Sequence, residues 1–130
     1  MVKMTTEEIR AGLQTQILGW EIAIYEQLES TNALALERGI EGAREGTLIL
    51  AESQTAGRGR HGRRWYAPSG VSILASLILR HRLLNRQIGI PNLIGAVAIA
   101  TAIRELTGLP ATIKWPNDVH IYGKKVSGVL

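Results

Sequence analysis

Hydrophobic residues recur along this chain with two different periods, and each change of period marks the boundary of an expected element. A capping-box pattern at residues 5–8 is followed by an apolar residue at every fourth position, which predicts a short amphipathic helix that ends near Gly19. Residues 20–28 alternate between apolar and polar and predict a strand. A second helical pattern occupies residues 34–43, and the Ser-Thr-Asn sequence at residues 30–32 is suited to capping its N-terminus.

The middle of the chain has two apolar runs on either side of a glycine- and arginine-rich segment. Residues 47–54 and 71–80 are rich in aliphatic side chains over strand-like lengths, so both are predicted to be strands. A polar loop is expected around Asn85, after the second of them. The segment between the two strands is therefore expected to be held at both ends by ordered structure.

The last part of the chain predicts one long helix and a small group of strands. Residues 90–106 carry apolar side chains at helical spacing before a glycine and a proline, and predict a buried helix. Residues 111–115 predict a strand, and the residues around Gly123 predict a β-hairpin. These elements indicate an α/β fold of the α+β type, with a mixed, largely antiparallel sheet backed by helices. Because the chain stops inside an apolar run at Leu130, the last strand is expected to pair with a complementary fragment or with a second copy in a homo-oligomer.

The composition is that of a globular protein whose positive charge is concentrated in one segment. With 130 residues, 45% of them hydrophobic, the chain is expected to be one domain or part of one. Its 15 basic and 11 acidic residues give a formal charge of +4, and four arginines lie between Gly57 and Trp65. General nucleic-acid affinity needs a broad basic surface, so a compact anionic ligand fits this distribution better.

Several classes of protein are excluded or disfavoured by what the sequence lacks. The absence of cysteine excludes disulfide scaffolds, thiolate zinc sites and cysteine nucleophiles. Acidic residues occur among the first nine positions, where a signal peptide needs an apolar core, and the uncharged run at residues 87–103 is shorter than the ~20 apolar residues of a membrane span. His61, His81 and His120 are scattered, so no metal site is predicted. We therefore expect a cytoplasmic protein without a membrane segment.

Residues 57–65, with the sequence G-R-G-R-H-G-R-R-W, are the most distinctive segment. Glycine permits backbone conformations with positive φ and a close approach to a ligand, and the arginine guanidinium matches carboxylate and phosphate geometry. The segment is short and ends on Trp65, unlike the long low-complexity tracts of flexible nucleic-acid-binding tails. It therefore predicts a shaped pocket for a phosphate or a carboxylate.

Four ordered motifs give a more specific signal: E-S-T-N at residues 29–32, Q-T-A-G-R-G-R-H-G-R-R-W at 54–65, K-W-P-N-D at 114–118 and K-K-V-S-G-V-L at 124–130. With these motifs the sequence resembles biotin protein ligase, also called biotin–acetyl-CoA-carboxylase ligase. The resemblance implies that residues 1–130 are the N-terminal part of a class II synthetase-like, biotin–lipoate ligase-like catalytic domain, without the remainder of that domain and the C-terminal β-barrel. Because the motifs begin within the first few tens of residues, it also implies the single-function class, which lacks a DNA-binding domain.

The resemblance implies an ATP-dependent ligase. The family joins biotin to ATP as biotinyl-5′-AMP and then transfers the biotin to a lysine in the biotin carboxyl carrier domain of a carboxylase. The implied small molecules are biotin, ATP and Mg²⁺, and DNA is not an implied partner. The 130 residues alone are expected to show weak or no ligase activity.

The resemblance also implies roles for individual residues. The implied catalytic residues are Arg58, Lys125 and Asp118, with Asp118 a candidate to orient or deprotonate the acceptor lysine. The residues implied to bind biotin are Ser30, Thr31, Asn32, Gln54, Gly57, Arg58, Arg60, Lys125 and Gly128. The residues implied to bind ATP are Arg58, Arg60, Arg63, Trp65, Asn117 and Lys125. Within this last set, Trp65 is expected to stack on adenine and Asn117 to lie near the nucleotide and its magnesium.

Structural explanations and other functions stay open at this point. Residues 30–32 can simply cap a helix, and residues 116–118 can simply form a Pro-Asn-Asp turn. Trp115 is expected in the core, whereas Trp65 is expected in the site. The alternative functions are a lipoate ligase-type acyltransferase, which shares the fold and the adenylate chemistry, and a non-catalytic remnant that binds a ligand or nucleic acid.

Overall fold

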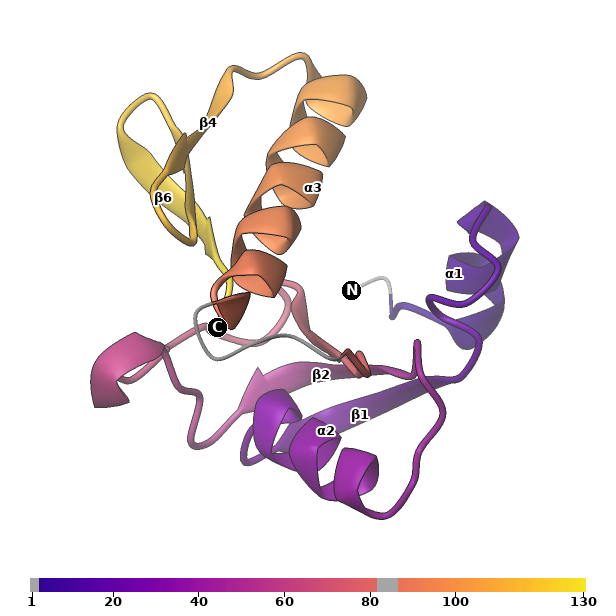
Figure 1. Ribbon diagram of the computed structural model, residues 1–130. Helices are drawn as coiled ribbons and strands as arrows, with labels where there is room; N and C mark the ends of the chain where they lie inside the picture. Colours follow the sequence, from indigo (N-terminus) through magenta and orange to yellow (C-terminus); the bar gives the residue numbers. More distant parts are fainter. Residues whose placement is uncertain (1–2, 82–86) are drawn as a thin grey trace. The chain divides into compact units, whose positions relative to one another are not determined.

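A computed structural model describes residues 3–81 and 87–130, which form two compact units (Figure 1). Gly59–His61, at the tip of the glycine- and arginine-rich loop, belongs with the second unit, whereas the rest of that loop belongs with the first. The polar loop predicted around Asn85 lies outside the described residues. The predicted mixed, largely antiparallel arrangement of strands is confirmed, and the described strands are divided between two sheets.

The first unit is a three-stranded sheet with a helix packed on it. Its strands, in the order in which they pair, are β1 (Ile22–Leu28), β2 (Leu48–Gln54) and β3 (Leu74–Leu77). Strand β1 is parallel to β2 and β3 is antiparallel to it. Helix α2 (Thr31–Ile40) connects β1 to β2 (Figure 1). Its Ala35 packs with Ile49 and Ile78 in the core. Strand β3 is shorter than the predicted 71–80 because it pairs only with the first part of β2.

The N-terminal helix α1 (Thr6–Gly12) begins as predicted and ends earlier than predicted. Thr5 Oγ1 accepts a hydrogen bond from Glu8 N at 3.2 Å, and Thr5 N donates to Glu8 Oε2 at 3.0 Å, which is the expected capping box. The predicted end near Gly19 is wrong. Leu13 at the C-cap is extended, with a ψ of 133°, and ends the helix there. Gly19 N donates to Gly46 O at 2.7 Å, so Gly19 is tied to a distant loop.

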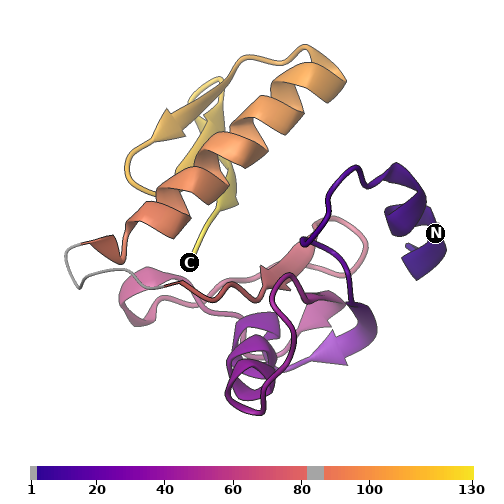
Figure 2. The ribbon, with the colours of Figure 1, turned by 45° about the vertical axis from the view of Figure 1, so that its right-hand side comes forward.

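The second unit packs one long helix against a three-stranded antiparallel sheet (Figure 2). Its elements are α3 (Ile90–Thr107), β4 (Ala111–Lys114), β5 (Asp118–Ile121) and β6 (Lys124–Gly128). The core contains Ala96 and Ala100 from the helix and Val119 from the sheet. Small helix residues allow close packing: a Cβ at Gly95 would lie 3.1 Å from Val129 Cγ1. The hairpin turns at Tyr122 and Gly123, both with positive φ, as a two-residue type I′ loop requires.

Helix α3 is buried on one face only, so the predicted burial of the helix holds for its sheet-facing side. Ala96 and Ala100 are buried, whereas Ile94 is 62% exposed and Leu106 is 85% exposed. By length and composition α3 is the one helix among the described residues that could cross a membrane, a test that core helices of soluble proteins also pass. Packing against the sheet explains the apolar residues on the buried face of α3, but not those on its exposed face.

Candidate functional site

Ser30 and Thr31 lie where β1 passes into α2, in the first unit. Ser30 is the N-cap of the helix, and its Oγ accepts a hydrogen bond from Ala33 N at 3.3 Å. Both residues are buried, and Asn32 is half-buried in the first turn. The capping explanation of Ser30 is therefore confirmed, while the buried hydroxyl of Thr31 needs a separate hydrogen-bond partner.

That partner is Gln54, the last residue of β2. Gln54 Oε1 accepts hydrogen bonds from Thr31 N at 2.7 Å and from Thr31 Oγ1 at 3.0 Å. Ser76 Oγ of β3 donates to Thr31 Oγ1 at 2.9 Å. These three side chains form a polar network across neighbouring elements of the first unit. Because the bonds to Thr31 use only the oxygen of the Gln54 amide, Nε2 has two N–H groups that can be offered to a ligand.

Ser76 belongs to this network and was missed by the sequence analysis. It lies in the short strand Leu-Ala-Ser-Leu and pairs in register with Ile49 of β2. The signal in the sequence is weak, because one serine in an otherwise apolar strand is common. Only the pairing of β3 beside β2 brings Ser76 to Thr31.

The glycine- and arginine-rich segment closes on itself directly after the end of β2. Trp65 N donates to Gly57 O at 2.9 Å, and Arg58 and Arg64 form an isolated antiparallel bridge. Gly57 is buried, and a Cβ there would lie 2.5 Å from Trp65 O and 2.9 Å from Gln54 Nε2. Only glycine fits this position, and its presence lets the base of the loop approach the Gln54 amide.

The loop arginines have different surroundings. Arg58, Arg63 and Arg64 are exposed, whereas Arg60 is half-buried. Arg60 begins a short 3₁₀ turn in which His61 has a positive φ of 58°. Within the second unit, Arg60 Nη1 donates to Asn117 Oδ1 at 3.2 Å.

Lys125 and Asp118 form an ion pair across β5 and β6, with Lys125 Nζ 2.9 Å from Asp118 Oδ1. Asp118 Oδ1 is buried, so the ammonium offsets a charge that water does not reach. Gly128 is the register partner of Asp118, and a Cβ there would lie 3.2 Å from Lys125 Nζ. The structure thus brings these three predicted residues together.

A register shift between Val119 and His120 makes this arrangement possible. Side chains alternate along a regular strand, so Lys125 and Gly128 would point to opposite faces. The irregularity pairs Lys125 with His120 and Gly128 with Asp118, which share one face of β5. The bulge therefore directs the lysine ammonium over the glycine.

Asn117 uses both ends of its side-chain amide. Its Oδ1 accepts from Arg60 Nη1, and its Nδ2 donates to Val129 O at 2.8 Å. The backbone adds a further bond, from Val129 N to Asn117 O at 2.9 Å. The predicted turn is also present, because Asn117 lies between β4 and β5.

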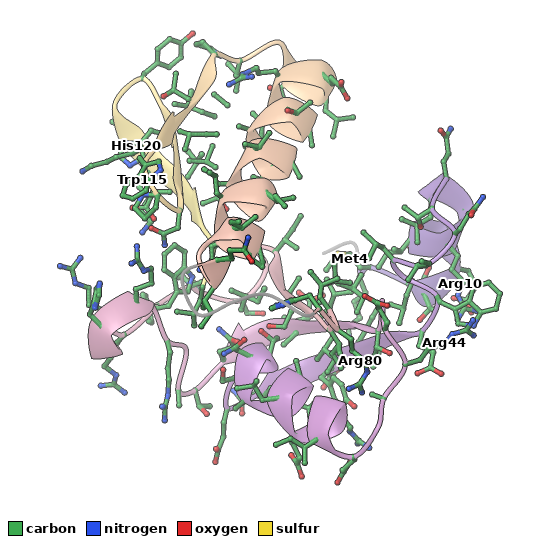
Figure 3. All side chains as sticks on the ribbon, viewed as in Figure 1. Met4, Arg10, Arg44, Arg80, Trp115 and His120 are labelled. Carbon is green, nitrogen blue, oxygen red and sulfur yellow. The ribbon has the colours of Figure 1, made fainter. Side chains whose placement is uncertain are left out.

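Of the two tryptophans for which a position was predicted, Trp115 does not occupy it. Trp115 is 77% exposed, so its predicted place in the core is wrong. It follows the last residue of β4 and begins the turn, outside the alternation that turns Ile113 toward α3. Figure 3 shows Trp115 and His120 on the side of the sheet that faces away from α3. Trp65 is half-buried at the end of the loop, and its contact with adenine stays a prediction.

The predicted residues therefore fall into two groups, one in each unit. The first unit holds the polar network and the base of the loop: Ser30, Thr31, Asn32, Gln54, Gly57, Arg58, Arg63 and Trp65. The second unit holds the loop tip and the hairpin residues: Arg60, Asn117, Asp118, Lys125 and Gly128. Each group combines hydrogen-bonding side chains with positive charge.

Comparisons with known proteins agree on one family. Residues 24–130 match the model of the biotin/lipoate A/B protein ligase family. The chain is similar to the bifunctional ligase/repressor BirA of Bacillus subtilis, with 41% identity over 128 residues, which are 98% of this chain and 39% of that protein. The chain thus spans well under half the length of this relative.

Solved structures extend the similarity to three dimensions. A biotin protein ligase from Aquifex aeolicus in complex with biotin and ATP is 32% identical, with a TM-score of 0.71 over 85% of this chain and 46% of that chain. A biotin protein ligase from Leishmania major in complex with biotinyl-5-AMP is 26% identical, with a TM-score of 0.71 over 85% of this chain and 51% of that chain. The fold is therefore shared with these enzymes.

Proposed function

The chain belongs to the biotin/lipoate A/B protein ligase family, and we propose that it is part of an enzyme that uses ATP to attach biotin to a carrier-protein lysine. Because the chain spans 39% of its Bacillus relative, this activity is proposed for the complete protein. In the first step a biotin carboxylate oxygen attacks the α-phosphorus of ATP, and pyrophosphate leaves. In the second step the lysine amine attacks the biotinyl carbonyl carbon, loses a proton, and AMP leaves.

The observation that carries the choice of biotin is the network of Thr31, Gln54 and Ser76. The ureido ring of biotin has a carbonyl acceptor and two N–H donors, which can pair with the Gln54 amide and the neighbouring hydroxyls. The dithiolane ring of lipoate has no such groups. A part-buried site built for hydrogen bonding rejects an analogue that leaves its polar groups unpaired. This supports biotin over lipoate as the substrate.

The cationic residues suit the first step. A carboxylate that attacks a phosphate is repelled by like charge, so the site must neutralise several anionic oxygens. We assign this role to Arg58, Arg60 and Arg63, whose guanidinium groups can make paired hydrogen bonds, together with the point charge of Lys125. The other proposed contacts are those to biotin from Ser30, Asn32, Gly57 and Gly128 and that to ATP from Trp65.

Asp118 suits the second step. The acceptor lysine is an ammonium ion at neutral pH and must lose a proton before it can attack. Asp118 is half-buried, and its buried Oδ1 lies 2.9 Å from Lys125 Nζ, so a lysine ammonium can approach this carboxylate closely. We assign to it the orientation and deprotonation of the acceptor lysine.

Magnesium is proposed to arrive with ATP and not to occupy a site built by this chain. No group of three or more His, Cys, Asp or Glu side chains within residues 3–81 and 87–130 could hold a metal ion. The candidate donor oxygens of Asp118 and Asn117 contact Lys125 and Arg60. Mg²⁺ is commonly bound through substrate phosphates and water, which needs few protein ligands.

The acceptor protein and the cellular compartment are also part of the proposal. The acceptor is proposed to be the biotin carboxyl carrier domain of a carboxylase, in the cytoplasm. The single-function class also stays a prediction, since the Bacillus relative combines a ligase with a repressor.

The decisive experiment is exchange of labelled pyrophosphate into ATP by the complete protein, with biotin or lipoate as the acid. We expect exchange with biotin, and no competition from a hundredfold excess of lipoate. Gln54→Ala is expected to raise the KM for biotin with little change in the KM for ATP. Exchange supported by lipoate and not by biotin, or by neither acid, would overturn the proposal.

A further inference from the structure

Asn117 joins two parts of the second unit that are far apart in sequence. Its side chain accepts a hydrogen bond from Arg60 in the loop and donates one to Val129, which follows the last residue of β6. An asparagine amide has one acceptor oxygen and two N–H donors, so the oxygen and one donor are engaged. The Arg60 bond is charge-assisted, and such bonds are stronger than those between neutral groups.

The Val129 end of this link is firmly anchored. Val129 packs against the core formed by α3 and the sheet, and a Cβ at Gly95 of α3 would approach Val129 Cγ1 to 3.1 Å. Two hydrogen bonds, Val129 N to Asn117 O and Asn117 Nδ2 to Val129 O, then tie Asn117 to this residue. The amide oxygen is thereby held at a fixed place, from which it can hold the Arg60 guanidinium.

We propose that Asn117 is a positioning residue that holds Arg60 and the end of β6 in a fixed relation, and is not a direct ligand of nucleotide or magnesium. The inference rests on the proposed function and changes the role that the motif suggested for Asn117. Strand β6 contains Lys125 and Gly128. The Asn117 side chain therefore holds the end of the strand that carries the Lys125 ammonium, and it also holds the Arg60 guanidinium. The effect of Asn117 on catalysis then passes through Arg60 and β6.

A trypsin assay tests the link without reference to ligase activity. Trypsin cleavage after Arg60 is followed by mass spectrometry in the complete protein and in Asn117→Ala and Asn117→Asp variants, with the thermal midpoint of each measured. Asn117→Ala is expected to speed this cleavage about three- to tenfold, the range for one part-buried hydrogen bond. Asn117→Asp keeps an acceptor for Arg60 and is expected to be cut no faster than the wild type. Thr112→Ala is the matched control, because its hydroxyl donates within the β4–β5 pair, to His120 O.

Kinetics in the pyrophosphate exchange assay separate positioning from direct binding. Asn117→Ala is expected to raise the KM for ATP about three- to tenfold and to leave the half-saturating magnesium concentration unchanged. In the Arg60→Ala background, which keeps the bond from Asn117 Nδ2 to Val129 O, the further change Asn117→Ala is expected to have a clearly smaller effect than in the wild type, because only the effect through β6 is left. Unchanged cleavage after Arg60 in Asn117→Ala, or additive effects of the two substitutions with a raised magnesium requirement, would overturn the inference. Failure of the proposed function would appear differently, as no biotin-dependent exchange in the wild type.

Discussion

Lys125 Nζ lies 2.9 Å from Asp118 Oδ1, so the two hairpin residues implied in catalysis are direct partners of each other. The pair depends on a glycine at 128 and on the register shift between β5 and β6, which together put the lysine ammonium above a buried carboxylate oxygen. An ammonium so placed is held near one point, which suits a group that must meet an anion. In the proposed second step, Asp118 would exchange this cation for the ammonium of the acceptor lysine.

Gly128→Ala is expected to displace the ammonium without unfolding the hairpin. The added Cβ would lie 3.2 Å from Lys125 Nζ and 3.4 Å from Asp118 Oδ1, and the end of a lysine side chain can move by a few tenths of an ångström. We expect a rise of several-fold in the KM for biotin or ATP and a nearly unchanged melting temperature. Gly12→Ala is the control, because a Cβ there meets nothing within 4 Å. Equal kinetics for the two variants would show that the position of the ammonium is not limiting.

Arg58→Ala and Lys125→Ala are expected to reduce adenylate formation far more than Arg64→Ala. Losing one charge-assisted bond to a buried anion costs about 1.5–3 kcal/mol, or roughly ten- to more than a hundredfold in rate. Arg58 and Arg64 are both exposed, and they pair with each other in an isolated backbone bridge. A difference between their variants therefore reports the position of the guanidinium group and not its exposure. Rates of pyrophosphate exchange at saturating and limiting biotin check the prediction. Equal losses for all three variants would mean that the arginines act only as a diffuse positive field.

Gly57→Ala is expected to destabilise the first unit. Its Cβ would lie 2.5 Å from Trp65 O, a backbone atom that cannot move without opening the base of the loop. Steric overpacking of this kind costs about 1–3 kcal/mol. Thermal unfolding should therefore show a lower midpoint for Gly57→Ala than for Gly89→Ala, where a Cβ meets nothing within 4 Å. Identical midpoints would indicate that the loop base opens freely.

Ser30→Ala is expected mainly to lower stability, whereas Ser76→Ala is expected mainly to weaken biotin binding. Ser30 caps α2, and loss of an N-cap side chain costs about 1 kcal/mol of stability. Ser76 is half-buried, donates to Thr31 Oγ1 and caps nothing, so its removal should weaken biotin binding more than it lowers the melting temperature. Calorimetric titration with biotin and thermal unfolding of both variants give the comparison. A larger loss of stability in Ser76→Ala than in Ser30→Ala, with unchanged biotin affinity, would show that Ser76 has a structural role only.

Local patterns were sufficient where the cause of a structure is local. The capping box at Thr5, the N-cap at Ser30 and the left-handed C-cap at Gly108 all follow from backbone groups that neighbouring side chains or a glycine satisfy. The period of apolar residues likewise predicted α3 and the hairpin at Gly123, because one buried face imposes that period. The four motifs identified the family and most of the residues proposed for the site.

Long-range pairing decided the rest, because its causes lie far apart in sequence. The helix that starts at Thr6 stops at Gly12, where Leu13 becomes extended, and Gly19 bonds to Gly46 in a distant loop. Trp115 is exposed, since the alternation of β4 ends before it. The sequence by itself therefore determined the elements, the family and the types of chemical group available. The tertiary structure decided which side chains meet. Strand register brings Ser76 to Thr31, and the fold of the loop tip brings Arg60 to Asn117. Both depend on burial that only the folded chain provides.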